Sequence, residues 1–321
     1  MNKKPIIIVS GEPNSIFLEI FFKSIKSKKY KNPLIIIVSK NLLIKQMKKL
    51  GFDYDINLLD KSYDNFNTLN NTKINLIDVN YKFKKCFENM SQKSNNYINE
   101  CFDIALKILK RNKFSKLLNG PISKKNFLGG KIPGITEYLA AKTQRKNKIA
   151  MLIYNNQLSV SPITTHLALK NVNKNLSKQK IYNHVKLILN FYKKNFKKIP
   201  KIAVTGLNPH CESNFKNSEE DFIIKPAIKK LKTMKYIIDG PFAADTVFMK
   251  ENLKKYDVII GMYHDQVLTP IKTLFGFDAI NITLGLPFIR ISPDHGPNTS
   301  MLGKNLSSPV SLIKALKFLD K

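Results

Sequence analysis

Cysteine, long apolar runs and a leader segment are scarce or missing in this 321-residue chain. Cys86, Cys101 and Cys211 are odd in number and form no CxxC pair, which argues against a disulfide framework or a zinc ribbon. No apolar run approaches the roughly 18 residues that a membrane helix needs. The apolar run at residues 6–9 is too short for a signal peptide and predicts a buried first strand. We therefore expect a cytoplasmic protein without a membrane partner.

Acidic residues and arginines are also few. The chain has 23 acidic against 54 basic residues, a formal net charge of +31, and its only arginines are Arg111, Arg145 and Arg290. A nucleic-acid-binding protein usually relies on arginine and gathers its charge in one patch. Here lysines follow the whole chain beside many Asn and Ile residues, as AT-rich codons favour. We therefore attribute the positive charge to codon bias and expect no nucleic-acid partner. A basic nucleic-acid-binding protein is kept as the remote alternative.

Familiar glycine motifs are missing as well. The chain has no GxGxxG, no GxxxxGK[ST] and no GxSxG, so a Rossmann fingerprint, a P-loop and a hydrolase elbow are not supported. Only 13 residues are glycine, and many of them fall between positions 206 and 303. Because glycine is needed where φ is positive or where backbones approach closely, we expect the tightest turns and the chemistry in this half.

Short β-rich runs alternate with helical periodicity, which predicts parallel α/β units. The polar, Asn-rich stretch 54–71 is expected to be a surface loop. A last helix is expected to start with Ser308 as its N-cap and Pro309 at its first position. The runs predicted as strands are residues 5–10, 33–39, 74–79, 149–154, 202–205, 258–262 and 279–284, and those predicted as helices include 99–110 and 181–192.

Three of the five histidines stand in polar, turn-rich segments where strands are expected to end: His166, His210 and His264. Open α/β sheets bind their ligands at the carboxyl ends of strands. Three imidazoles converging there would form a divalent metal site with open positions for substrate, which we favour slightly over three isolated histidines. His184 falls in an amphipathic helix and is interpreted as structural, and His295 falls in a loop.

For three charged residues, the sequence pattern alone gives weaker support for a functional role. Arg290 follows a predicted strand and would suit a phosphate or carboxylate, although a surface ion pair is the plainer interpretation. Asp245 is most simply interpreted as a helix N-cap. Lys272 is one of many lysines, and composition does not distinguish it.

Taken together, the motifs resemble one enzyme family. Segments 206–210 (GLNPH), 241–246 (PFAADT), 262–266 (MYHDQ) and 281–290 (NITLGLPFIR) resemble, in order, those of the 4-hydroxythreonine-4-phosphate dehydrogenases of vitamin B6 biosynthesis. Segments near residues 11, 119 and 164 fit the same family. The resemblance implies a two-domain α/β/α sandwich like isocitrate and isopropylmalate dehydrogenases, with the active site in the interdomain cleft. The implied domains are residues 1–125 with 280–321, and 126–279, which would hold the metal ligands and dimer contacts.

The resemblance also implies the site. It assigns a divalent metal to His166, His210 and His264, shared between the subunits of a homodimer. Zinc is the first choice among metals, and cobalt, magnesium and manganese stay open, as does NAD against NADP. Catalysis is implied for Lys272 or for a water held by Asp245. Substrate contacts carry over to Thr136, Lys272, Asn281 and Arg290, and cofactor contacts to Asp294, His295 and Gly296.

The implied reaction is oxidation of 4-phosphooxy-L-threonine at C3 by NAD(P)+, after which the β-keto acid loses CO2 to give 3-amino-2-oxopropyl phosphate on the route to pyridoxine 5'-phosphate. The chain departs from the family at three places. Ile135 replaces a histidine that contacts substrate, the 11–19 segment lacks two glycines, and the loop after Gly296 lacks the family's small residues and acid. Ile135 favours the alternative, a paralogue that oxidises another phosphorylated β-hydroxy acid such as a threonate phosphate.

Overall fold

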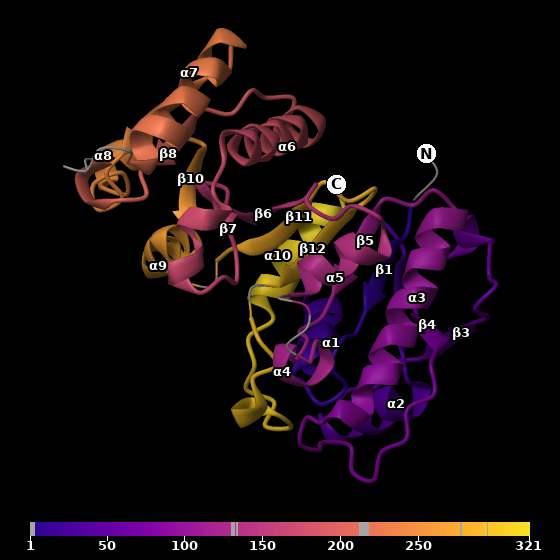
Figure 1. The fold of residues 1–321 in the computed structure, drawn as a ribbon. Coiled ribbons are helices and arrows are strands. Elements are labelled where there is room, and N and C mark those ends of the chain that lie inside the picture. Colours follow the sequence, from indigo (N-terminus) through magenta and orange to yellow (C-terminus); the bar gives the residue numbers. More distant parts are fainter. Residues whose placement is uncertain (1–3, 130–131, 133, 212–217, 277, 294) are drawn as a thin grey trace. The chain divides into compact units, whose positions relative to one another are not determined.

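The structure is a computed structural model that describes residues 4–129, 132, 134–211, 218–276, 278–293 and 295–321. The chain folds into two compact units (Figure 1). Unit 1 comprises Met1–Ile135 and Pro287–Lys321, and unit 2 comprises Thr136–Leu286. The bounds expected from the sequence lie at 125/126 and 279/280. Both units combine strands and helices, so the predicted α/β fold class is confirmed.

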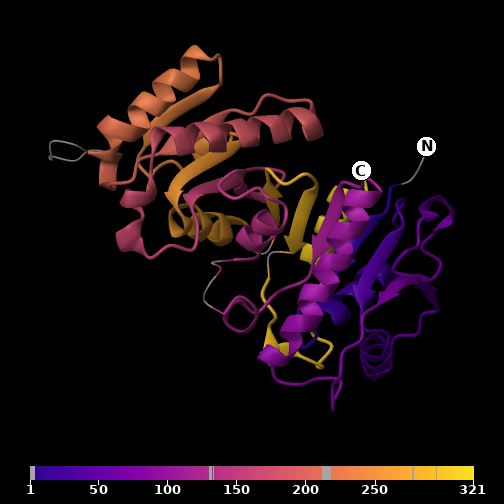
Figure 2. The same cartoon turned by 45° about the vertical axis from the view of Figure 1, so that its right-hand side comes forward.

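Unit 1 contains a parallel sheet whose strands are ordered β3-β4-β2-β1-β5-β12. Every residue of β1 and β2 is buried, as expected when helices cover both faces of a parallel sheet. Figures 1 and 2 show α3 lying along one face of this sheet. The strands are β1 (Ile6–Val9), β2 (Leu34–Val38), β3 (Ile56–Leu59), β4 (Ile74–Asp78), β5 (Lys116–Asn119) and β12 (Ile289–Pro293), and the helices are α1 (Phe17–Ser27), α2 (Lys40–Lys49), α3 (Asn95–Arg111), α4 (Lys124–Phe127) and α10 (Val310–Leu319).

Three expectations for unit 1 were wrong in detail. The stretch 54–71 is not a continuous loop, because β3 forms within it and pairs with β4. Most residues of β3 are only partly buried, so its polar composition reflects exposure and not the absence of a strand. Helix α10 begins one residue later than expected, with Pro309 as its N-cap. Arg290 does not follow a strand, because it is the second residue of β12.

Unit 2 contains a mixed sheet ordered β11-β6-β7-β10-β8-β9. Strand β10 pairs in parallel with β7 and β8, whereas β6 is antiparallel to β7 and β11, so the expectation of purely parallel pairing was wrong here. The strands are β6 (Ala150–Tyr154), β7 (Ser159–Thr164), β8 (Ile202–Thr205), β9 (Ile238–Phe242), β10 (Val258–Tyr263) and β11 (Ile280–Leu284), and the helices are α5 (Ile135–Lys142), α6 (Lys178–Phe196), α7 (Lys225–Thr233), α8 (Lys250–Leu253) and α9 (His264–Phe275).

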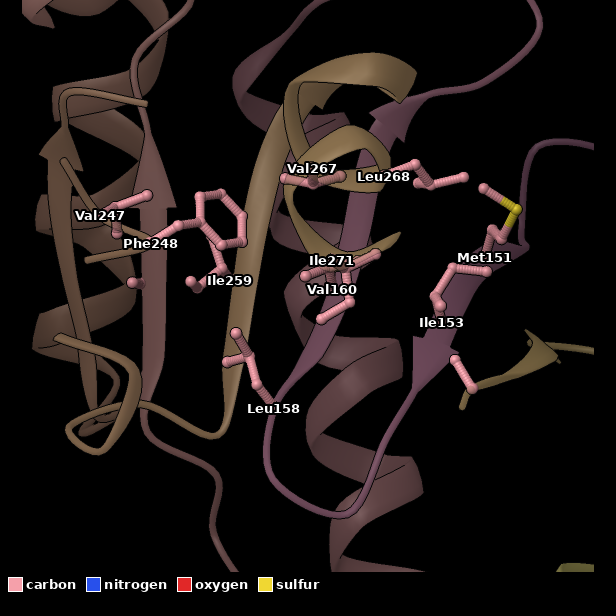
Figure 3. Packing of buried hydrophobic residues seen from close by; sticks show 12 residues of the cluster. Met151, Ile153, Leu158, Val160, Val247, Phe248, Ile259, Val267, Leu268 and Ile271 are labelled. Atoms are coloured by element: carbon pink, nitrogen blue, oxygen red, sulfur yellow. The ribbon is translucent and has the colours of Figure 1, made fainter. Parts of the chain in front are cut away.

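The core of unit 2 fixes the helix that begins at His264. Val267, Leu268 and Ile271 of α9 pack in one cluster with Val160 of β7 and other buried side chains (Figure 3). Burial of each such aliphatic side chain stabilises a fold by about 1.5–3 kcal/mol. The first turn of α9 is therefore anchored at the carboxyl end of β10. Among the described residues, none of the helices combines the length and hydropathy that crossing a bilayer requires.

Candidate functional site

Three neighbouring strands of unit 2 each lead to one of the predicted histidines. Strands β7, β10 and β8 are adjacent and parallel, so their carboxyl ends share one edge of the sheet. His166 follows β7, His264 is the first residue of α9 after β10, and His210 follows β8. This is the edge at which open α/β sheets bind ligands. The three segments therefore follow strands that end at the same edge of the sheet.

Two of these imidazoles lie close together. The ring centroids of His166 and His264 are 5.8 Å apart. Nδ1 of His264 lies 2.7 Å from Oδ1 of Asp265, and Nδ1 of His166 lies 3.9 Å from Oε1 of Glu137. The 3.9 Å separation at His166 is too long for a hydrogen bond. At His264, the carboxylate beside Nδ1 favours a proton on that nitrogen and leaves the Nε2 lone pair for another partner. Metal-binding histidines are commonly oriented in this way.

Glu137 had no assigned role before the structure was known. Its Oε1 accepts a hydrogen bond from Thr165 Oγ1 at 3.2 Å, so the carboxylate is tied to the residue next to His166. Its Oε2 is buried and finds no hydrogen-bond partner in the part of the chain that the structure describes. The sequence signal for Glu137 is its position next to Thr136, which is a predicted site residue.

His210 is placed differently. It lies exposed in the short 3-10 turn Pro209–Cys211, and its φ of 58° is left-handed. His166 is also left-handed, with a φ of 52°. Non-glycine residues rarely adopt this conformation and often do so at functional sites. Within the described parts of this chain, no group of three or more His, Cys, Asp or Glu side chains is placed to hold a metal.

Asp245 lies near the turn that carries His210. It is exposed in the turn after β9 and is not a helix N-cap, because Met249 occupies that position at α8. Burial raises the pKa of the Cys211 thiol, and the negative charges of Glu220 and Asp245 act in the same direction. The charge of Asp245 therefore reaches the residue next to His210. Lys272 lies exposed on α9, about two turns after His264.

Two of the predicted substrate residues of unit 2 lie at β11, since Asn281 belongs to this strand and Thr136 of α5 contacts it. Thr136 Oγ1 lies 3.4 Å from Thr283 Oγ1, and both threonines are buried. Asn281 precedes Thr283 by two residues and so points to the same face of the strand. Its Nδ2 lies 3.7 Å from Met151 Sδ, and among the described residues its buried Oδ1 has no hydrogen-bond partner. Such an acceptor costs about 1–3 kcal/mol and is a place to expect a ligand.

Arg290 belongs to unit 1 and is only 1% exposed. Its Nε donates a hydrogen bond to Asn119 Oδ1 at 2.7 Å. The Asn119 amide in turn donates to the Gly120 carbonyl at 2.7 Å, so the Asn119–Gly120 segment fixes one side of the guanidinium. In the loop after β12, His295 Nδ1 lies 3.0 Å from the Gly296 carbonyl. Asp294, the third residue predicted to bind cofactor, lies outside the described residues.

A family model described as pyridoxal phosphate biosynthetic protein PdxA matches residues 29–319. The chain belongs to the PdxA family. A 4-hydroxythreonine-4-phosphate dehydrogenase of Sulfurihydrogenibium sp. is 37% identical over 97% of this chain and 96% of its own length. A relative in Oceanobacillus iheyensis, named for D-threonate 4-phosphate, is 31% identical over 98% of this chain and 97% of its own length.

A solved structure of PdxA type supports the fold as well. The 4-hydroxythreonine-4-phosphate dehydrogenase of Klebsiella pneumoniae superposes with a TM-score of 0.83 at 27% identity, and the match covers 99% of this chain and 97% of that one. Family membership makes this chain an oxidoreductase. The predicted enzyme class and family are confirmed.

Proposed function

We propose that this chain oxidises 4-phosphooxy-L-threonine at C3 with NAD(P)+ in a metal-dependent reaction. The C3 carbon loses a hydride and its hydroxyl loses a proton, which leaves a β-keto acid that releases CO2 to form 3-amino-2-oxopropyl phosphate. The observation that carries the proposal is the pair of imidazoles of His166 and His264, 5.8 Å apart, each with a carboxylate near Nδ1. The name of the Sulfurihydrogenibium relative supports the substrate.

The donor set fits a divalent metal. His166 and His264 would offer Nε2 atoms from one chain, and His210 stands on the neighbouring strand end. Since one chain groups only two of these rings among its described residues, we propose a homodimer in which a second copy completes the set. A divalent ion held by imidazoles would supply Lewis acidity, which lowers the pKa of an alcohol. Imidazole ligands suit zinc and cobalt in particular.

The remaining residues would bind and orient the substrate. Thr136 and Asn281 present polar groups from one face of unit 2, and Arg290 presents a buried guanidinium from unit 1. A guanidinium and an amide suit phosphate or carboxylate oxygens. Lys272, or a water held by Asp245, would take the proton of the C3 hydroxyl. His295 and Gly296, together with Asp294, would contact the cofactor.

One observation favours a second candidate, oxidation of D-threonate 4-phosphate. Ile135 opens α5 next to Thr136, and its side chain cannot donate a hydrogen bond to a substrate. The Oceanobacillus relative named for that substrate matches nearly the whole chain. The two substrates differ at C2, which carries an amine in one and a hydroxyl in the other. The choice between them therefore depends on contacts to C2.

The deciding experiment measures reduction of NAD+ and NADP+ by chelator-stripped protein, with and without added Zn²⁺ or Co²⁺. Each phosphorylated substrate is tested at matched concentration. We expect metal-dependent turnover of 4-phosphooxy-L-threonine. Preference for D-threonate 4-phosphate would establish the second candidate instead. Silence with both substrates, from protein that is folded and dimeric by circular dichroism and light scattering, would refute the proposed function.

A further inference from the structure

Two polar side chains of unit 2, Gln266 and Glu220, hold the loop that carries His210. We call this loop the His210 loop, residues 206–211, and the two side chains the loop brace. Neither residue belongs to the metal or substrate set proposed above. Gln266 comes from the first turn of α9, and Glu220 comes from the helical turn that leads into α7. The loop brace therefore reaches the His210 loop from two different elements.

Gln266 uses its whole amide group to join two strand ends. Its Oε1 accepts hydrogen bonds from Met262 N at 2.7 Å and from Thr205 Oγ1 at 2.8 Å. Its Nε2 donates to the Gly206 carbonyl at 2.7 Å. Gln266 follows His264 by two residues. One side chain thus links the end of β8, where the His210 loop starts, to the end of β10, where His264 stands.

Glu220 accepts hydrogen bonds from the start of the same loop. Its Oε1 accepts the backbone N–H groups of Leu207 at 2.7 Å and Asn208 at 2.9 Å, and its Oε2 accepts Asn208 Nδ2 at 2.9 Å. The residue is only 1% exposed. Burial acts to raise the pKa of Glu220, but hydrogen bonds from Asn208 and Leu207 outweigh it, and the pKa lies below its ordinary value. A buried, charged carboxylate is therefore stabilised by the loop itself.

The His210 loop needs this support because its backbone is unfavourable. His210 and Cys211 both have a φ of 58°, a conformation that side-chain-bearing residues rarely adopt. The loop is also closely packed against the brace. A Cβ atom on Gly206 would lie 2.7 Å from Cys211 Sγ and 3.0 Å from Glu220 Oε1. The surroundings therefore determine where His210 is held.

We propose that Gln266 and Glu220 are positioning residues that fix the His210 loop relative to the start of helix α9, and so set the place of His210 relative to His264. The proposal rests on the proposed function, in which His210 and His264 are both metal ligands and a second copy of the chain completes each site. Outer-shell partners of metal ligands typically change metal affinity by about 10- to 100-fold when they are removed. We expect a loss of that size for each member of the loop brace.

The test uses full-length protein carrying Gln266→Ala, Gln266→Glu, Glu220→Ala or Glu220→Gln. Gln266→Glu keeps both acceptor contacts and loses the donor to Gly206. Glu220→Gln keeps one acceptor oxygen for the two backbone N–H groups, so it should rescue part of the loss. The matched control is Asp221→Asn, because Asp221 neighbours Glu220 but forms an exposed ion pair with Lys225. Circular dichroism and thermal melting establish that each variant is folded.

Two readouts are made on each variant. The first is affinity for Co²⁺ or Zn²⁺ by calorimetric titration, and the second is hydrogen exchange of the 206–211 segment in metal-free protein. We expect weaker metal binding and faster exchange in brace variants, larger for alanine than for the conservative changes, and neither effect in Asp221→Asn. Folded brace variants with wild-type metal affinity would overturn the proposal.

The readouts also separate this proposal from the proposed function. If wild-type protein binds no divalent metal, the metal site of the proposed function fails, and exchange alone then decides the inference. Faster exchange confined to the 206–211 segment would support the positioning role in that case. Unchanged exchange in the conservative variants and in any alanine variant that folds would overturn it.

Discussion

Two histidines lie at different places along strand β7 and differ in their partners and in their burial. His184, from α6, contacts the middle of the strand, where its Nε2 lies 2.6 Å from Ser161 Oγ. His166 follows the end of the same strand, beside Glu137 and 5.8 Å from the ring of His264. Burial lowers the pKa of His184 to about 3, and the charge of Lys180 acts in the same direction. The position along the strand, and not the residue type, separates a structural histidine from a candidate ligand.

This difference shows why the edge of the sheet can do chemistry that the middle cannot. Inside unit 2, an imidazole is kept neutral and is satisfied by a serine hydroxyl. At the edge, turns follow the strands, and His166 and His210 there have left-handed backbone. The Asp265 carboxylate beside His264 then leaves the other ring nitrogen of that histidine for a ligand. Four measurements test this difference between the edge and the middle of the sheet.

The first and greatest of these effects is a loss of activity when a histidine at the edge of the unit 2 sheet is replaced. His264→Asn removes one proposed metal ligand, so kcat should fall by more than the roughly 100-fold that loss of an outer-shell partner costs. The side chain is 37% exposed, and the melting temperature should change little. Steady-state kinetics at saturating metal, with Asp221→Asn as control, make the measurement. A His264→Asn enzyme that keeps wild-type kcat would contradict the metal site.

The second effect is on stability in the middle of the sheet. His184→Ala leaves a cavity and removes one of the two hydrogen-bond partners of the Ser161 hydroxyl, which should reduce the free energy of unfolding by about 2–3 kcal/mol. Activity per folded molecule should stay unchanged, because His184 is remote from the strand ends in this interpretation. Urea titration and kinetics at low temperature check both halves. A His184→Ala variant that loses kcat but keeps its stability would show that His184 has a functional role and not a structural one.

The third effect concerns Glu137, the carboxylate beside His166. Glu137→Gln keeps the size of the side chain and removes its charge, so metal affinity should fall by about 10- to 100-fold. Glu100→Gln is a matched control, because Glu100 forms an exposed ion pair with Lys61. Titration with Co²⁺ measures both variants. Equal Co²⁺ affinities of the Glu137→Gln and Glu100→Gln variants would show that Glu137 does not orient His166.

The fourth effect is a pH dependence of stability that comes from His184. Between pH 6.5, the ordinary pKa of histidine, and pH 3, the unfolded chain binds a proton at residue 184 that the folded chain does not. Stability therefore falls as the pH falls through this window, by about 1.4 kcal/mol per pH unit from this group. His184→Gln should remove that part of the slope. Urea titrations from pH 7 to pH 4 compare the two proteins, and parallel curves would show that His184 is not buried as a neutral ring.

The sequence predicted those elements whose pattern is local. Continuous apolar runs gave β1 and β2, and helical periodicity gave α3 and α6, because burial acts on each residue separately. Strand β3 was missed because it lies among polar residues and is only partly buried. Strand β12 was missed because it contains Arg290, whose burial depends on Asn119 from a distant segment.

The candidate site was predictable to a similar degree. Turn-rich contexts after strands singled out His166 and His264, and the structure places their rings together. Glu137, Gln266 and Glu220 gave no such signal. Gln266 contacts Thr205 and Gly206 across about 60 residues of sequence, a pairing that follows from sheet order and not from any motif. Side chains that orient other side chains are visible only once the strands are ordered.

The left-handed backbone at His166 and His210 has an evolutionary consequence. Glycine and asparagine adopt this conformation more easily than histidine, so at both positions the fold alone would favour replacing the imidazole. Under the proposed function, in which both histidines bind the metal, selection for activity would oppose that drift. A descendant of this chain released from catalysis should therefore acquire Gly or Asn at positions 166 and 210 early, while the apolar residues of its strands persist. These two positions record whether a lineage still performs the reaction.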